Sequence, residues 1–156
     1  MIANFVRFWI FGDIPIATAT LKKTTASTLI ERQQASRELA SLAAQACEDL
    51  KGKETVVLDL TPVTPIADFF VVTTATSGRQ MRAIAEDVEQ LMKKHGSRPR
   101  VGVEGRESDT WILQDYGDIV LHVFSSDGRA LYDLEHLWAD APHIDWKPLA
   151  KKLAEE

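Results

Sequence analysis

Few side chains in this sequence have the type and spacing that catalysis or metal binding requires. The candidates for metal ligands are four histidines, His95, His122, His136 and His143. No two of them stand four residues apart, and the sequence has neither an H-E-x-x-H nor a C-x-x-C motif. The single cysteine, Cys47, can form neither an internal disulfide nor a cysteine-rich metal site. The sequence therefore predicts no metal centre and no bound cofactor.

Two pairs of aspartates are the remaining candidates for metal-assisted chemistry. Asp59 and Asp68 flank a loop with two prolines, whereas Asp115 and Asp118 flank a turn that contains glycine. Either pair would suit Mg²⁺, as in nucleotide-handling enzymes. Aspartates also accumulate in turns because their side chains cap and bend the backbone. We favour the turn interpretation, since no phosphate-binding glycine loop and no G-x-S-x-G motif accompanies these acids.

The charge of the chain bears on the partners that it can bind. Its 156 residues carry a net charge of -5, and the pI is near 5.4. A broad surface that neutralises phosphates is therefore not expected, and nucleic acid is not the predicted main contact. An acidic surface would favour encounter with a basic protein.

The N-terminal segment, residues 1–30, is expected to lie outside the folded domain. Its apolar run is interrupted by Arg7 and Asp13 and is too short to span a membrane. A secretory signal peptide is an alternative because residues 17–19 read Ala-Thr-Ala, although almost no positive charge precedes the apolar run. We interpret the segment as a disordered extension or as the result of a start site placed too far upstream.

Two long amphipathic helices are predicted from apolar residues that recur at helical spacing. The first covers residues 29–50, and Gly52 terminates it. The second begins near Arg79 after a capping residue, Thr76 or Ser77. A shorter helix over residues 127–138 closes the domain.

Five strands are predicted from runs rich in β-branched and aromatic residues. They cover residues 55–60, 69–74, 101–103, 110–116 and 119–124. The order of elements predicts one α/β (α+β) domain over residues 31–146, with a mixed sheet of about five strands flanked by the helices. Residues 147–156 contain Pro148 and are expected to form a C-terminal tail. His122 lies in an apolar strand, which favours a structural histidine over a ligand.

Large apolar side chains gather near the C-terminus of the predicted domain. They are Trp111, Tyr132, Leu134, Leu137 and Trp138. Core packing explains some of them, but aromatic residues also anchor protein interfaces. The sequence leaves open which of these side chains fill the core and which bind a partner.

A long ordered pattern resembles the ribosomal silencing factor family, RsfS, also called Iojap-like. The pattern consists of Thr55 to Leu60, Ala67-Asp68-Phe69, Thr76-Ser77-Gly78-Arg79-Gln80, Gly102-Val103-Glu104-Gly105, Trp111, Asp115, Gly117-Asp118, Val120, His122, Arg129, Tyr132, Leu134-Glu135 and Leu137-Trp138. The resemblance covers about residues 37–146. Ala75 stands where the family usually has glycine.

The resemblance implies a nucleotidyltransferase-like fold without catalytic residues. It implies a cytoplasmic, non-enzymatic factor that binds protein fourteen of the large ribosomal subunit, blocks joining of the small subunit and so represses translation. Family members in organelles assist assembly of the large subunit. The positions that match the family's binding face are Trp111, Asp115, Tyr132, Glu135 and Leu137. Trp111 is the expected anchor of this face.

The alternative is a nucleotide-binding or nucleotidyltransferase-type enzyme. The fold relationship and the two aspartate pairs motivate it. The free protein is expected to be a monomer or a weak homodimer, because an exposed hydrophobic patch tends to self-associate.

Overall fold

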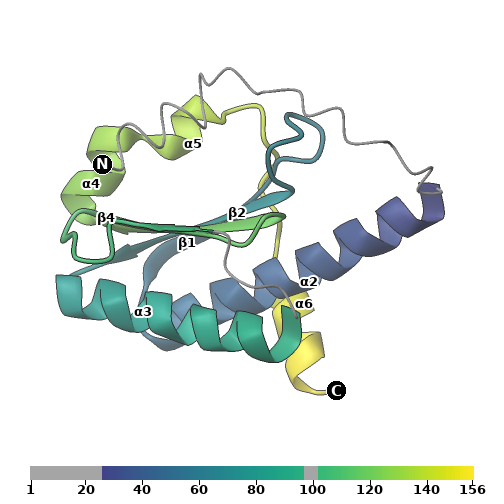
Figure 1. Ribbon diagram of the computed structural model, residues 1–156, viewed down its shortest axis with the longest axis horizontal. Coiled ribbons are helices and arrows are strands. Elements are labelled where there is room, and N and C mark those ends of the chain that lie inside the picture. The colour runs from purple at the N-terminus through teal and green to yellow at the C-terminus, as the bar shows by residue number, and fades with distance from the viewer. Residues whose placement is uncertain (1–25, 97–101) are drawn as a thin grey trace.

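The structure of this chain is a computed structural model that describes residues 26–96 and 102–156 (Figure 1). The predicted N-terminal extension lies outside the described residues as far as residue 25. The first described helix already begins at Ala26, inside the segment that the sequence placed outside the domain.

The described helices and strands follow one another in nearly the predicted order. They are α2 (Ala26–Asp49), β1 (Lys53–Asp59), β2 (Phe69–Ala75), α3 (Gly78–Leu91), the π-helical turn η1 (Met92–Gly96), β3 (Gly102–Glu104), β4 (Trp111–Asp115), β5 (Ile119–Ser125), α4 (Ser126–Tyr132), α5 (Leu134–Leu137) and α6 (Lys147–Ala154).

The five strands form one mixed sheet in the order β1-β2-β5-β4-β3. β2 and β5 run parallel, while the other neighbouring strands are antiparallel. In Figure 1, α2 and α3 cover one face of the sheet, and α4 and α5 lie on the other. The predicted mixed five-stranded sheet with flanking helices is therefore confirmed.

Each face of the sheet has its own hydrophobic core. The first core lies between the sheet and the helices α2, α3 and α6, and includes Ala43, Val71, Ile84, Val88 and Leu121. The second core lies under α4 and α5, and includes Phe70, Trp111, Leu113, Phe124 and Leu134. Because both faces are covered, every residue of β2 and of β4 is buried.

Helix α3 follows the pattern that its sequence predicts. The Ser77 side chain accepts a hydrogen bond from the Gln80 backbone N–H, and the Gln80 side chain in turn accepts from the Thr76 N–H. This reciprocal cap satisfies donors that the first helical turn leaves unpaired. The predicted apolar face is confirmed, since Met81 and Ile84 are fully buried.

The closing segment forms two helices where the sequence predicts one. Asp133 has a left-handed backbone with φ of 42°, and it separates α4 from α5. Left-handed residues end helices and are usually glycine or asparagine, so the sequence carried no strong signal for this break.

The C-terminal segment is packed against the domain, contrary to the predicted tail. The Pro142 carbonyl accepts a hydrogen bond from the Asp59 N–H, and the Ile144 N–H donates to the Val57 carbonyl. These bonds cover the outer edge of β1. Trp146 is buried, and α6 then packs against α2. Pro148 misled the prediction, because proline close to the start of a helix is favourable.

Within the described ranges, no helix has both the length and the apolar character that crossing a bilayer requires.

Candidate functional site

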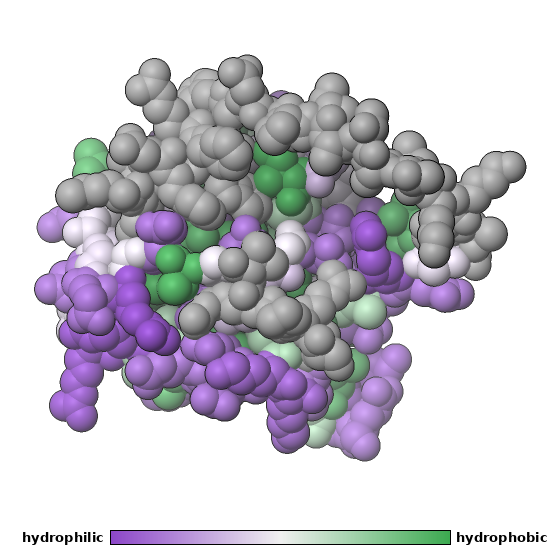
Figure 2. Space-filling view, viewed as in Figure 1, coloured by the Kyte–Doolittle hydropathy of each residue, from purple (hydrophilic) through white to green (hydrophobic). Residues whose placement is uncertain are grey.

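Helices α4 and α5 present the most exposed apolar side chains near the predicted binding face. Leu131 is 74% exposed and Leu137 is 46% exposed. Figure 2 shows hydrophilic side chains gathered along the lower side of the molecule, over α3, while a hydrophobic group emerges near α4. We call residues 126–140 the α4–α5 surface. Exposed leucines of this kind mark protein-binding surfaces when they cluster.

Acidic residues surround the two leucines. Asp127, Asp133 and Asp140 are exposed on the α4–α5 surface. Arg129, which also belongs to this surface, is largely buried and paired with Glu135, and His136 Nδ1 lies 3.7 Å from Asp133 Oδ2. The surface therefore combines exposed apolar groups with negative charge, which is complementary to a basic protein.

Arg129 fastens α4 to the edge of the sheet. Its Nη1 donates to Thr74 Oγ1 at 3.1 Å and its Nη2 donates to the Glu54 carbonyl at 2.9 Å. Its Nε donates to Glu135 Oε1 at 2.9 Å, so the guanidinium also holds α5. Glu135, predicted to bind a partner, is engaged in this internal ion pair and positions α5.

Trp111 lies in the second core and is 1% exposed. Its ring packs against Tyr132 at 4.5 Å and Phe124 at 4.7 Å between centroids. Its Nε1 donates to Nδ1 of His122 at 3.2 Å. The prediction of an exposed anchor at Trp111 is therefore wrong, because β4 has a neighbouring strand on each side and both of its faces are covered. Trp111 instead supports Tyr132, which is half-buried under the α4–α5 surface.

His122 is a structural histidine, as its apolar strand predicts. Burial, together with the nearby positive charge of Arg129, lowers the pKa of His122 to about 3. The ring is therefore neutral near pH 7. Because Nδ1 accepts from Trp111, the ring proton resides on Nε2.

Asp115 is 8% exposed and belongs to the hairpin turn. Its Oδ1 accepts a hydrogen bond from the Gly117 N–H at 2.7 Å. Burial raises the pKa of the Asp115 carboxyl, and the Gly117 N–H opposes this shift. Gly117 has φ of 86°, which glycine adopts without strain. The Asp115 side chain is buried and shapes the turn, so it is not an exposed contact residue.

The other aspartates of the two pairs also have hydrogen-bond or ion-pair partners. Asp59 Oδ1 accepts from the N–H and the hydroxyl of Thr61. Asp118 Oδ2 accepts from Ser36, and Asp68 lies 4.0 Å from Arg32. In the described part of the chain, no group of three or more potential ligands is placed to hold a metal ion. The contacts that Asp59 and Asp115 make within their own turns favour the turn interpretation over the Mg²⁺ interpretation.

The predicted site residues thus divide by exposure. Leu137 is exposed, Tyr132 and Glu135 are half-buried, and Trp111 and Asp115 are buried. The sequence reasoning missed Leu131, the most exposed large apolar residue that the structure describes. A signal was present, since Leu131 directly precedes Tyr132, a member of the apolar cluster.

Comparison with known proteins gives consistent matches to one family. The family model described as "Ribosomal silencing factor during starvation" (RsfS) matches residues 33–156. The ribosomal silencing factor RsfS of Halalkalibacterium halodurans is 39% identical over 109 residues, which are 70% of this chain and 92% of that protein. A mouse protein named mitochondrial assembly of ribosomal large subunit protein 1 is 32% identical over 88 residues, covering 55% of this chain and 39% of that protein.

Solved structures agree with these matches. A crystal structure of a Chromobacterium violaceum protein has a TM-score of 0.62 at 40% identity, covering 65% of this chain and 84% of that one. A crystal structure from Bacillus halodurans has a TM-score of 0.60 at 36% identity, covering 69% of this chain and 97% of that one. With a family model that spans most of its length and relatives that share its fold, the chain belongs to the RsfS family of ribosomal silencing factors.

Proposed function

We propose that this chain silences ribosomes by binding the large ribosomal subunit and preventing the small subunit from joining. Membership of the RsfS family supports this role, because the bacterial relatives are named ribosomal silencing factors. The names of the mouse and plant relatives support a link to the large subunit and to Iojap proteins. The factor would act in the cytoplasm as a regulatory protein without catalysis, and it would also assist large-subunit biogenesis.

The α4–α5 surface is the proposed contact with the large subunit. The observation that carries this assignment is the exposure of Leu131 and Leu137 among the acidic residues Asp127, Asp133 and Asp140. Apolar residues would provide the buried centre of an interface, and an acidic rim would speed encounter with a basic partner. We propose that this partner is protein fourteen of the large subunit.

Trp111 and Tyr132 act together in this proposal. Tyr132 lies between the buried Trp111 ring and the surface, so its ring is oriented by packing before a partner arrives. An aromatic residue held in this way loses little conformational entropy on binding. Phosphate groups would be repelled by the acidic rim, so ribosomal RNA is not the proposed main contact.

Subunit joining tests the proposal directly. Purified protein is mixed with separated small and large subunits, and the mixture is resolved on a sucrose gradient. We expect the full chain to reduce the peak of joined ribosomes and to sediment with the large subunit. Normal joining at saturating protein, with no protein in the large-subunit fraction, would contradict the proposal.

Single substitutions test the surface itself. Leu137→Glu adds a charge to the proposed centre, and we expect binding to the large subunit to weaken by about tenfold or more. Ile30→Glu is the matched control, because Ile30 is 65% exposed on α2, remote from α4 and α5. If both variants bind like the unchanged chain, the contact lies elsewhere.

A further inference from the structure

The chain before Ala26 contains a run of large apolar side chains. Residues 5–16 read F-V-R-F-W-I-F-G-D-I-P-I, and they hold three of the six phenylalanines and one of the four tryptophans. Interrupted by Arg7 and Asp13, this run is too short to span a membrane. Clustered apolar groups of this kind are usually buried against another surface. We call residues 5–16 the N-terminal apolar segment.

The charge of residues 1–25 is opposite to that of the α4–α5 surface. These residues contain Arg7, Lys22 and Lys23 against a single acid, Asp13, although the whole chain has a net charge of -5. The α4–α5 surface exposes two leucines among three aspartates. The two parts of the chain therefore match in apolar character and in charge. A second α4–α5 surface would match less well, because its aspartates would repel those of the first.

Helix α2 begins near one end of the α4–α5 surface. Arg32 of α2 lies 4.0 Å from Asp68. The Asp68 carbonyl accepts a hydrogen bond from the Leu60 N–H, and the neighbouring Asp59 N–H donates to the Pro142 carbonyl. Pro142 stands two positions after the last residue of the α4–α5 surface. These contacts bring the first turns of α2 and the end of that surface to the same end of the sheet.

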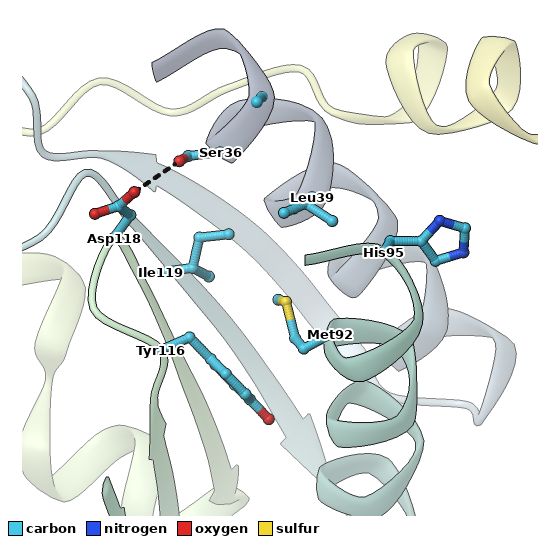
Figure 3. Close-up of a pocket in the computed structure, with 8 residues that line it drawn as sticks. Ser36, Leu39, Met92, His95, Tyr116, Asp118 and Ile119 are labelled. Atoms are coloured by element: carbon cyan, nitrogen blue, oxygen red, sulfur yellow. Dashed lines mark hydrogen bonds between the residues drawn. The ribbon is translucent and has the colours of Figure 1, made fainter. Parts of the chain in front are cut away.

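A further contact fixes the direction in which α2 starts. The Ser36 hydroxyl donates to Oδ2 of Asp118 at 3.1 Å. Figure 3 shows this bond between α2 and the turn that joins β4 to β5. Ser36 is 3% exposed, and α2 is one continuous helix from Ala26. The point at which residues 1–25 join the domain is therefore fixed relative to the sheet.

The chain between the N-terminal apolar segment and α2 is long enough to reach the surface. Residues 17–25 connect the two, and nine extended residues span about 30 Å. The rise of α2 from Ala26 to Arg32 is only about 9 Å. Short tethers hold two sites at an effective concentration of about 1 mM. A contact with an intrinsic Kd of about 0.1 mM would then favour the docked state about tenfold.

We propose that the N-terminal apolar segment docks on the α4–α5 surface and covers Leu131 and Leu137. Its aromatic side chains pack on the two leucines, and Arg7 lies beside the exposed aspartates. The docked segment occupies the contact that is proposed for the large ribosomal subunit, so it competes with that partner. The competition rests on the proposed function, whereas the docking does not.

A spin label tests the docking in the full chain. Asn4→Cys, combined with Cys47→Ala, places a nitroxide directly before the N-terminal apolar segment. We expect it to broaden the amide NMR signals of residues 127–140 and to leave those of α3, on the other face of the sheet, sharp. A mixture of spin-labelled chains and label-free ¹⁵N-labelled chains should show no broadening, because the docking occurs within one chain. Intact mass confirms that residues 1–25 are present.

Substitutions on both sides of the contact locate it. Phe8→Ala with Trp9→Ala removes two rings from the segment, and Leu131→Ala shortens an exposed side chain of α4 that is 74% exposed. Each change should weaken docking by about tenfold or more, which at least roughly halves the docked fraction and the broadening. Thr18→Ala with Thr20→Ala is the matched control in the connecting residues and should leave the broadening unchanged.

Binding to purified large subunits measures the competition. Phe8→Ala with Trp9→Ala should bind them about tenfold more tightly than the unchanged chain, because the surface is no longer covered. The threonine control should bind like the unchanged chain. Unchanged binding of the aromatic variant, with weaker binding of Leu137→Glu, would overturn the competition. Docking together with unchanged binding of both variants would instead place the ribosome contact elsewhere and leave the docking in place.

Four outcomes would overturn the docking itself. The first is the absence of broadening at residues 127–140, and the second is equal broadening of α3. The third is broadening in the mixed sample, which would mean that the segment docks on a second copy. The fourth is unchanged broadening in Leu131→Ala together with Phe8→Ala and Trp9→Ala. Cosedimentation with phosphatidylglycerol vesicles in place of broadening would assign the segment to a lipid surface.

Discussion

The two faces of the sheet differ in the side chains that pack on them. On the first face, α2 contributes small residues such as Ala40, Ala43 and Ala44, all of them fully buried. Their size allows a long helix to pack closely on aliphatic strand residues. On the second face, two short helices cover an aromatic cluster that includes Phe70, Trp111, Phe124, Tyr132 and Trp138.

The second face also has the less complete hydrogen bonding. Two of its buried donors, His122 Nε2 and Trp138 Nε1, have no hydrogen-bond partner within the described ranges. Each such group costs about 1–3 kcal/mol of stability. Proteins tolerate such costs mainly at functional sites. We infer that the second face, although it is a core, gives up some stability in presenting the α4–α5 surface.

The largest expected effect comes from removing the centre of the second face. Trp111→Ala deletes a fully buried ring and the hydrogen bond to His122, and should lower the free energy of unfolding by about 3–5 kcal/mol. Urea denaturation measures this loss. Trp111→Phe keeps a ring in place and should lose markedly less. A change below about 0.5 kcal/mol for Trp111→Ala would mean that the second face is not a core.

The next effect concerns the link between α4 and the sheet. Arg129→Met removes bonds to Thr74 and Glu54 and leaves Glu135 without its partner. Breaking a buried pair costs about 3–5 kcal/mol. Glu135 is 27% exposed and can recover water, so we expect about 2–3 kcal/mol in urea denaturation. Arg129→Lys, with one charged group in place of the planar fork, should recover only part of this loss.

The buried histidine of the second face, His122, should make the free energy of unfolding depend on pH. The folded-state pKa of His122 is about 3, below its ordinary value of 6.5. Between these two pKa values, the His122 ring is protonated in the unfolded chain and neutral in the folded chain. The stabilising contribution is complete above pH 6.5 and is lost as the pH falls toward 3, by about 1.4 kcal/mol per pH unit.

Urea midpoints at pH 7 and pH 5 measure this contribution. The unchanged chain should lose roughly 2 kcal/mol more than His122→Gln between these values. Equal losses in the two proteins would show that His122 is protonated, or accessible to water, in the folded state.

The sequence predicted the first face better than the second. Met81, Ile84 and Val88 recur at helical spacing on one side of α3, and the structure buries all three. This periodicity arises because one side of the helix meets water. β4 carries no equivalent signal, since both of its sides are buried. Whether Trp111 is exposed or buried could therefore not be predicted from the sequence of β4.

Two further features were hidden for local reasons. Asp133 adopts a left-handed conformation without the glycine that usually marks one. Leu131 and Leu137 lie on either side of Asp133, in α4 and α5. The sequence did not predict the break between these two helices. Similarly, Trp146 is buried through long-range contact with β1, where its Nε1 donates to the Thr55 carbonyl at 3.4 Å.

The smallest expected effect separates surface from core within a single short helix. Leu134 and Leu137 both belong to α5, but Leu134 is 3% exposed and Leu137 is 46% exposed. Leu137→Glu should change the free energy of unfolding by no more than about 0.5 kcal/mol, whereas Leu134→Glu buries a charge and should unfold the second face. Thermal denaturation of both variants makes the comparison. A large loss of stability in Leu137→Glu would place Leu137 in the core, because a leucine that is 46% exposed has little packing to lose. The α4–α5 surface would then lack one of its two apolar contacts.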